Sequence, residues 1–371
     1  MNFTRSESQQ QLTDAVARLL ATNYDFAERR TQLQLPADQL PPIWTLLVQL
    51  GLPGLLQTQD AGGFGGTSAE LYFVQQQFGR ALVVAPWLDT LLCSEAVAAA
   101  GSPAQRATLL PGVITGHAVL AWADEDLDRA DGEGPLVTRA VDHGGEWRLD
   151  GAKACVSHGS ACTHYLVSAS TAAGARGLFL VERGARGMRQ DPHRLADGAW
   201  AVDLVFTNTS AQPLAGMPLD GHEEAHVRMR QLAIVAACAD AVGGAEAALE
   251  LTVQHLRTRR QFGAPLAGYQ VLRHRIAEMY ILLEQARSMG LLAACSDAVQ
   301  DIQDRSRQLA QAKLVTLRSA KWITQQAIQL HGGMGMSNES PIGHYYRRVL
   351  VLDARHGNER QQLAFLAASA A

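Results

Sequence analysis

Apolar side chains recur at helical spacing near the start of the chain. Leu12, Val16 and Leu19 form one such stripe, and Trp44 and Leu47 begin another. Pro and Gly residues separate the stripes, and the pattern continues to about residue 115. This first part of the chain is therefore predicted to be helical.

From about residue 116 to residue 215 the apolar positions form short β-prone runs between Gly and Asp turns. The runs lie at residues 118–122, 146–149, 164–168, 177–181 and 201–205. Strands at this spacing, without helical segments between them, predict a small antiparallel barrel or sandwich.

Helical spacing returns at about residue 222 and continues to the end of the chain. The predicted helices lie near residues 224–258, 267–296, 301–331 and 340–353. We therefore predict an α+β, mainly α fold with three domains. They are an N-terminal helical domain (1–115), a middle β domain (116–221) and a C-terminal four-helix bundle (222–371).

Composition excludes several classes of function. The formal net charge of −4 offers no basic surface for nucleic acid. The five cysteines include no C-x-x-C pair, so neither a disulfide framework nor a metal site is predicted, and a reducing cytoplasm fits best. The N-terminus has no basic segment followed by an apolar one, and no run of about 18 uncharged apolar residues occurs. We expect no membrane partner.

Two short segments in the C-terminal part combine polar, aromatic and glycine residues. They are Arg259–Gly263, with the sequence RRQFG, and Gln329–Met336, with the sequence QLHGGMGM. An arginine supplies a fixed fork of donors to a phosphate, and an aromatic side chain can pack against a ring. Glycines let backbone N–H groups approach such a ligand closely. Either segment alone is also typical of a helix–helix loop with a capping glycine.

Together these segments resemble the flavin-holding segments of the acyl-CoA dehydrogenase family. The order of helices, β domain and four-helix bundle is also the family's order, and the resemblance covers nearly the whole chain. Within the family the chain is most similar to the small-subunit type associated with pimeloyl-CoA and steroid side-chain dehydrogenases. Further segments that carry the resemblance are Ala61–Ser68, Pro86, Gly151–Lys153, Cys238–Gly243 and Gln325–Gly333.

The resemblance implies FAD as the cofactor and α,β-desaturation of an acyl-CoA thioester as the reaction. It implies a homo- or hetero-oligomer, a dimer or tetramer, and an electron acceptor such as an electron-transfer flavoprotein. In the family the segment that matches Arg259–Gly263 reaches the flavin of a partner subunit. The expected cofactor-binding residues are Arg259, Gln261, Phe262, Gln329, Gly332, Gly333, Ser157 and Asn358.

The β domain departs from the family pattern. Asp124–Asp126 and residues 128–130 stand where flavin-contacting hydroxyl and turn residues are expected. The pyrimidine edge of a flavin gains negative charge when the flavin is reduced, and carboxylates beside it would repel that charge. Cys155 replaces an aromatic wall, whereas Ser157 keeps a hydroxyl that could reach the flavin. We therefore expect a degraded site for the chain's own flavin beside intact segments for a partner's flavin.

The sequence leaves two candidates for the catalytic base. His356 stands where most of the family carries a glutamate, and an imidazole with a pKa of about 6.5 could take a proton, but residues 354–358 also suggest a solvated turn. Asp240 is the better candidate because a lone carboxylate in an apolar helix usually has a reason, although an ion pair with an arginine would also explain it. Glu246 and Glu250 are expected to be solvent or interface charges.

Two other functions stay open. One is a non-catalytic partner subunit that completes the flavin site of a second acyl-CoA dehydrogenase chain, which predicts a colourless protein when this chain is purified alone. The other is a flavin oxidase or monooxygenase of the same fold, in which His356 or Asp240 acts on a substrate without CoA. That alternative predicts rapid reaction of the reduced flavin with oxygen and no bleaching by any acyl-CoA.

Overall fold

The computed structural model describes residues 5–127 and 136–370. The chain forms two compact units, each built from separate stretches of sequence. The first unit joins the stretch up to Arg29 with Thr67–Val83 and everything from Ile234 onward. The second unit joins Arg30–Gly66 with Val84–Ala233. The division into three domains at residues 115 and 221 stays a prediction.

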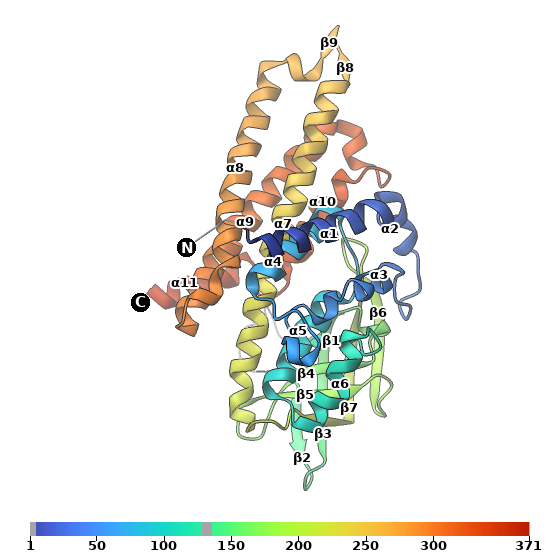
Figure 1. The fold of residues 1–371 in the computed structure, drawn as a ribbon, viewed down its shortest axis with the longest axis vertical. Coiled ribbons are helices and arrows are strands. Elements are labelled where there is room, and N and C mark those ends of the chain that lie inside the picture. Colours follow the sequence, from blue (N-terminus) through green and yellow to red (C-terminus); the bar gives the residue numbers. More distant parts are fainter. Residues whose placement is uncertain (1–4, 128–135, 371) are drawn as a thin grey trace. The chain divides into compact units, whose positions relative to one another are not determined.

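The N-terminal part is helical, as predicted. Its helices are α1 (Glu7–Asn23), α2 (Phe26–Gln32), α3 (Ile43–Gln49), α4 (Ser68–Ala81), α5 (Trp87–Ala100) and α6 (Pro103–Ile114) (Figure 1). Three of them begin with a capping box, in which the side chain of Ser6, Thr67 or Ser102 accepts an amide hydrogen bond, and the side chain of a Glu or Gln three residues later accepts the amide of the capping residue. These caps fix the start of α1, α4 and α6 locally.

The β region forms a small closed barrel. Its strands are β1 (Leu120–Ala123), β2 (Arg139–Asp142), β3 (Trp147–Ser157), β4 (His164–Ser170), β5 (Arg176–Glu182), β6 (Met188–Arg194) and β7 (Trp200–Pro213). Strands β4, β2, β3, β7 and β5 pair in turn, and β5 pairs again with β4, which closes the ring. The predicted small barrel is confirmed, and most of its pairings are antiparallel, but β1 and β2 each pair with β4 in parallel.

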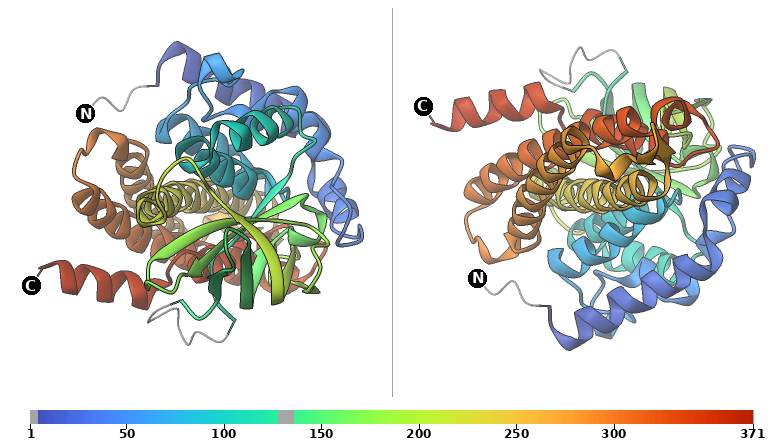
Figure 2. Two further views of the ribbon diagram at one scale, coloured as in Figure 1. Left: turned by 90° about the horizontal axis from the view of Figure 1, so that it is seen from below. Right: turned by 90° about the horizontal axis from the view of Figure 1, so that it is seen from above.

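The C-terminal part is a helical bundle. Its helices are α7 (His222–Thr258), α8 (Gln270–Ala294), α9 (Ile302–His331), α10 (Ile342–Ala354) and α11 (Glu359–Ala370). Helices α7 to α10 correspond to the four predicted segments, and the apolar spacing does not single out α11. Buried side chains from α7, α8, α9 and α10 share one core, and Figure 2 shows these helices alongside one another.

Helix α7 approaches α4 closely because both helices carry glycines where they meet. A Cβ added to Gly79 would lie 2.1 Å from the carbonyl oxygen of Asp240, and one added to Gly243 would lie 2.0 Å from that of Gln76. Only glycine fits at such a backbone contact. The contact places the side chains of α4 directly against the middle of α7.

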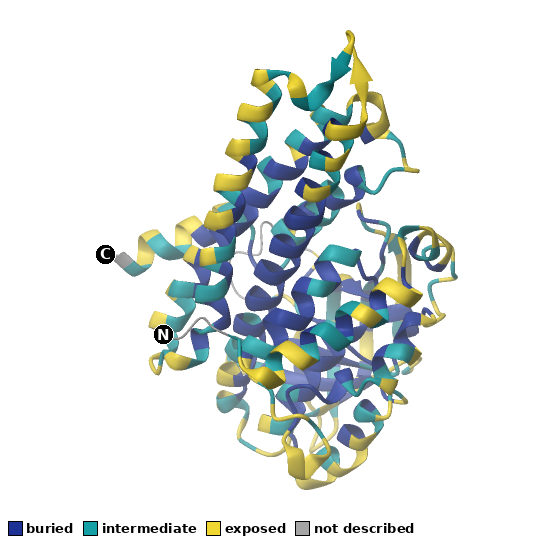
Figure 3. Cartoon of the chain, turned by 45° about the horizontal axis from the view of Figure 1, so that its top comes forward, coloured by how far each residue is buried: buried dark blue, intermediate teal, exposed yellow. Residues whose placement is uncertain are grey.

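By length and composition the segment Leu219–Thr258 could cross a membrane, with a mean hydropathy of 1.6 over its most apolar window. That window is entirely buried within the structure. Figure 3 shows that the interior of the bundle is buried, whereas the residues at the tip that connects α7 to α8 are largely exposed. The apolar character of this segment is therefore explained by its place in a core.

Candidate functional site

The predicted residues Arg259, Gln261 and Phe262 lie at an exposed tip. A hairpin of β8 (Arg260–Gln261) and β9 (Ala264–Pro265) connects α7 to α8 (Figure 1). Phe262 is 90% exposed and has a φ of 53°, a left-handed conformation that is uncommon for a bulky residue. The Tyr269 hydroxyl donates to the Gln261 carbonyl at 3.1 Å and holds the turn. The cofactor-binding role of Phe262 stays a prediction.

The second predicted segment lies at the same end of the bundle. His331 ends α9, and its ring stacks on that of His255 with 4.4 Å between centroids. The His255 carbonyl accepts the Arg259 amide at 2.9 Å, so the stacked pair connects the hairpin to the turn that follows α9. Gly332 and Gly333 are exposed, and nothing lies within 4 Å of a Cβ built on either, so there is free space beside them, although the Gly332 amide donates to the Gln329 carbonyl. The structure thus brings the two motifs together.

Burial lowers the pKa of both stacked histidines. For His255 the charges of His331 and Arg259 lower the pKa further, whereas for His331 a hydrogen bond from Nδ1 to the Ala327 carbonyl partly opposes the effect of burial. The lowered pKa values favour the neutral form of both imidazoles beside Arg259.

Asp240 lies in a buried ion pair. Its side chain is 1% exposed, and Arg348 of α10 donates to it from Nη2 at 2.8 Å and from Nε at 3.2 Å. The Gln75 amide of α4 donates at 2.8 Å. This arrangement is the ion-pair alternative considered from the sequence. It occupies both carboxylate oxygens and favours a structural role.

Glu246 also belongs to a buried network, so the expectation of a solvent or interface charge was wrong for this residue. Its side chain is 7% exposed and binds Arg80 at 3.1 Å and Arg287 at 2.7 Å. The Glu250 side chain is 60% exposed and binds Arg80 at 2.7 Å. Helices α4, α7 and α8 are thereby joined by charge as well as by apolar packing.

The loop that carries His356 is buried and held by side chains, so the solvated-turn interpretation was wrong. His356 is 8% exposed and has a φ of 56°. The buried ammonium group of Lys313 donates to the carbonyl groups of Arg355 and Gly357. Gln362 donates to the His356 carbonyl at 3.2 Å. Two side chains thus fix the backbone of the loop that carries the buried imidazole.

Asn358 follows this loop and caps α11. Its side-chain oxygen accepts the Gln361 amide at 3.0 Å, and the Gln361 side chain accepts the Asn358 amide at 2.7 Å. This capping box explains the local sequence without a ligand.

The acidic segment of the β domain turns inward. Asp126 forms a fully buried ion pair with Lys153 at 2.7 Å, and Thr138 donates to it at 2.6 Å. Asp124 accepts hydrogen bonds from Ser168 at 2.7 Å and His226 at 2.8 Å. The side chains of Asp124 and Asp126 are thus engaged inside the β domain. The degraded flavin site stays a prediction, and residues 128–130 lie outside the described part of the chain.

This network keeps the carboxylates charged. Burial opposes the charge of Asp124, but His226, Lys153 and Arg176 together hold its pKa well below the usual range. Burial lowers the pKa of the Lys153 ammonium group, and the two aspartates partly offset that effect.

The predicted residue Ser157 lies at the end of β3 and is buried.

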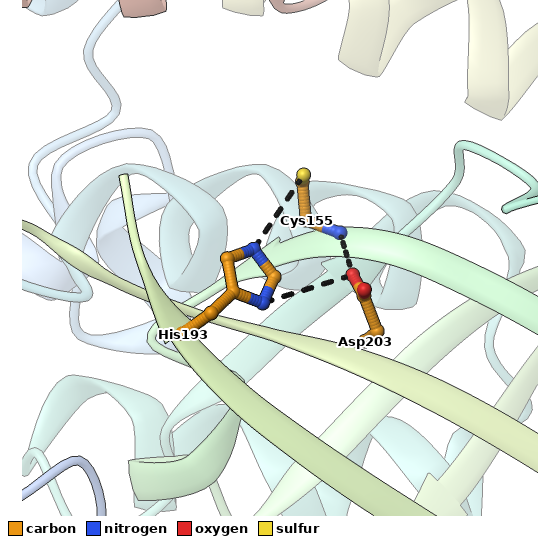
Figure 4. A group of neighbouring side chains, drawn as sticks. All are labelled: Cys155, His193 and Asp203. Atoms are coloured by element: carbon orange, nitrogen blue, oxygen red, sulfur yellow. Dashed lines mark hydrogen bonds and ion pairs between the residues drawn. The ribbon is translucent and has the colours of Figure 1, made fainter. Parts of the chain in front are cut away.

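Cys155 lies beside two side chains that the sequence analysis missed. Its Sγ is 3.8 Å from Nε2 of His193, and the other ring nitrogen of His193 is 4.0 Å from the Asp203 carboxylate (Figure 4). The three residues come from β3, β6 and β7. They are far apart in sequence, and β6 has no apolar alternation that would predict a strand, so no sequence signal joins them.

Comparison with known protein families covers both ends of the chain. Residues 6–117 match the acyl-CoA dehydrogenase N-terminal domain, and residues 227–371 match the acyl-CoA dehydrogenase C-terminal domain. The two matches together span more than half of the sequence. The chain belongs to the acyl-CoA dehydrogenase family. The fold and enzyme class of this acyl-CoA dehydrogenase, a flavoprotein oxidoreductase, are thereby confirmed.

Several relatives of this acyl-CoA dehydrogenase match over most of its length. It is 26% identical over 372 residues to acyl-CoA dehydrogenase FadE27 of Mycobacterium tuberculosis. That alignment covers 98% of this chain and 97% of the relative. It is 26% identical over 327 residues to an NADH-dependent acryloyl-CoA reductase of Anaerotignum propionicum, covering 84% and 82%. The solved structure of the Tcur3481-Tcur3483 steroid ACAD is 27% identical with a TM-score of 0.89, covering 98% and 97%.

Proposed function

We propose that this chain holds FAD within an oligomer and catalyses the α,β-desaturation of an acyl-CoA thioester. The observation that carries the proposal is the exposed hairpin tip with Arg259, Gln261 and Phe262 beside the open backbone of Gly332 and Gly333. A guanidinium, an aromatic ring and glycines that leave space for close approach suit a dinucleotide. Because the tip stands out in solvent, its ligand fits better on a second subunit than on its own bundle.

The residues present fit FAD in part. Arg259 would meet the pyrophosphate charge, Phe262 would pack on a ring, and Gln329 would add a polar contact. Ser157 offers a hydroxyl, and Asn358 could contribute its side-chain N–H₂ group, since its oxygen caps α11. When bound, FAD supplies the acceptor for the hydride that leaves the substrate β-carbon. The chain's own residues must hold the thioester and remove the α-proton.

We propose His356 rather than Asp240 as the group that takes this proton. The Asp240 carboxylate is engaged by Arg348 and Gln75, and a base must have a lone pair available for the substrate. The His356 backbone is held by Lys313 and Gln362, which places the imidazole reproducibly. A fixed side chain lowers the cost of reaching a reactive geometry.

The substrate class and partners follow from the relatives and from the resemblance. A medium-chain, dicarboxylyl or steroid side-chain thioester is proposed, and the steroid ACAD relative supports the last of these. The acryloyl-CoA reductase relative shows that related chains also work in the reducing direction. An electron-transfer flavoprotein would be the electron acceptor in a cytoplasmic oligomer.

The first test is an absorbance spectrum of the chain purified alone, followed by anaerobic addition of acyl-CoA thioesters. The proposal expects a yellow protein that one class of thioester bleaches. Arg259→Ala should lose most of its flavin on gel filtration, and His356→Ala should keep the flavin but lose the bleaching. Each variant is thus the matched control for the other. Equal flavin loss in both variants would refute the assignment of Arg259.

A non-catalytic partner subunit is the second candidate, favoured by Cys155 in place of the aromatic wall. In that case the chain alone is colourless, and adding a second acyl-CoA dehydrogenase chain restores bleaching that Arg259→Ala abolishes. A yellow protein whose reduced flavin reacts rapidly with oxygen, and that no acyl-CoA bleaches, would instead indicate a flavin oxidase or monooxygenase.

A further inference from the structure

We propose that Cys155, His193 and Asp203 form a reactive thiol site that exchanges with small-molecule disulfides. The thiol step does not use the flavin, but Cys155 stands at the predicted flavin wall, so the thiol is tested in the flavin-free chain. It is built on three neighbouring strands, because β7 lies between β3 and β6 and pairs with both. Asp203 comes from the central strand, and Cys155 and His193 come from the strands on either side of it; Figure 4 shows the three side chains pointing toward one another.

The backbone of β3 is shaped to present the thiol. The pairing of β3 with β7 shifts register between Lys153 and Val156, which places Cys155 in an irregularity of the strand. Cys155 has a φ of 53°, which is uncommon for a residue other than glycine, and it is exposed. The Asp203 carboxylate accepts the Cys155 amide at 2.8 Å and stabilises this conformation. Bulges of this kind often aim a side chain at a functional site.

The His193 imidazole lies between the thiol and a carboxylate, as a base that activates a thiol requires. Nδ1 of His193 faces two acceptors, the Asp191 carbonyl at 3.4 Å and the Asp203 carboxylate at 4.0 Å. A proton on Nδ1 therefore has partners, which leaves the Nε2 lone pair directed at Cys155 Sγ at 3.8 Å. Cys155 is thus the nucleophile, His193 the base beside it and Asp203 the carboxylate that orients the base, which is the arrangement of activated cysteine sites.

The same donors could in principle hold a metal ion, since their ligand atoms lie within 4.8 Å of one another. The ring orientation argues against it. The thiol and the carboxylate face different nitrogens of one imidazole, whereas a zinc ion about 2.0 to 2.3 Å from each ligand would need both on the side of one nitrogen. The observed order suits proton transfer better than shared coordination.

The proposed step is an exchange that needs only a disulfide as co-reactant. His193 takes the thiol proton, and the Cys155 thiolate attacks one sulfur of a disulfide R–S–S–R. The new bond joins Cys155 Sγ to that sulfur, the R–S–S–R bond breaks, and the leaving thiolate takes the proton from His193. Cys155 is oxidised to a mixed disulfide, and one molecule of R–SH is released. A second thiol reverses the step.

Burial makes the other four cysteines poor competitors. Burial raises the pKa of the Cys93 thiol well above its usual value and raises those of Cys162 and Cys238 to about 12. Cys295 is half-buried, and burial raises its pKa as well. Of the five, only Cys155 is exposed. Cys295 therefore serves as the internal control thiol.

The test uses the full-length protein and glutathione disulfide, with adducts followed by intact mass and peptide mapping. We expect one glutathione per chain, on Cys155, formed roughly tenfold or more faster at neutral pH than any adduct on Cys295. His193→Gln should slow the Cys155 reaction about tenfold and leave Cys295 unchanged. Asp203→Asn keeps an oxygen for the Cys155 amide, so it should slow the reaction less than Asp203→Ala.

A pH series separates base catalysis from a structural effect. The titratable groups that the structure places against the thiol are His193 from β6 and Asp203 from β7. About one unit above the ordinary thiol pKa of about 8.5, hydroxide supplies the thiolate, and His193→Gln should react like wild type. A defect that persists there, equal labelling of Cys155 and Cys295, or one-to-one protection of Cys155 by Zn²⁺ would each overturn the proposal.

Discussion

Replacing Asp240 with asparagine should destabilise the first unit without touching a reactive group. The substitution keeps the side-chain volume and removes the charge. Arg348 would then place its guanidinium, 16% exposed as a side chain, against a neutral amide. The change tests directly whether this carboxylate is structural or catalytic.

The expected loss of stability follows from the burial of the Asp240–Arg348 ion pair. Removing one partner of a buried ion pair costs about 3 to 5 kcal/mol, because the other charge stays desolvated. Arg348 also donates to the Val83 carbonyl at 3.0 Å and is slightly exposed, so the lower end, about 3 kcal/mol, is expected. In a domain of about 200 residues this corresponds to a fall in melting temperature of roughly 6 to 12 °C.

Thermal unfolding followed by circular dichroism measures the effect. Glu250→Gln, on the same helix, is the matched control: it breaks an ion pair whose carboxylate is 60% exposed, and it should cost less than about 1 kcal/mol. The double variant Asp240→Asn with Arg348→Met should recover part of the loss, since neither charge is then left alone. An Asp240→Asn protein that melts like wild type but is not bleached by acyl-CoA would refute the reasoning and identify Asp240 as the base.

Two further predictions concern other buried charges. Lys153→Met leaves Asp126 without its fully buried partner and should lower the free energy of unfolding by about 3 kcal/mol; a loss below about 1 kcal/mol in a urea titration would contradict this. The pKa values of His255 and His331 are lowered in the folded protein, so the unfolded chain binds protons first as the pH falls through about 6.5. Stability should therefore decrease below that pH, and less so in His255→Phe; melting curves with equal pH slopes would refute this.

Much of the fold could be predicted because its signals are local. The long helices of the bundle repeat apolar residues at helical spacing, and the helix starts carry capping side chains such as Ser102. Strands β2 and β6 could not be predicted, because neither alternates apolar and polar residues. They exist because β3 and β7 are long enough to pair with them. Their formation depends on partners far away in the sequence.

In the candidate site, too, some residues could be predicted from local sequence and others depend on distant partners. Arg259 and Gly332 belong to short segments that a linear pattern reveals. The partners of Asp240 lie on α4 and α10, and the bonds that hold His356 come from α9 and α11, so burial and pairing there depend on tertiary packing. Sequence alone identifies the buried carboxylate as unusual but cannot supply its arginine.

The closed ring of strands has a consequence for self-association. Five strands pair in a circle, in which β2 and β4 share only the pair Arg139–Ser170, and the buried strand β1 covers the edge of β4 beside that pair. Strand β6 also lies outside the ring, pairs only with β7 among the described strands, and carries Arg189, Asp191, Pro192 and Arg194. Charged side chains and a proline oppose the addition of another strand. The barrel is thereby protected against edge-to-edge aggregation where its backbone is most accessible.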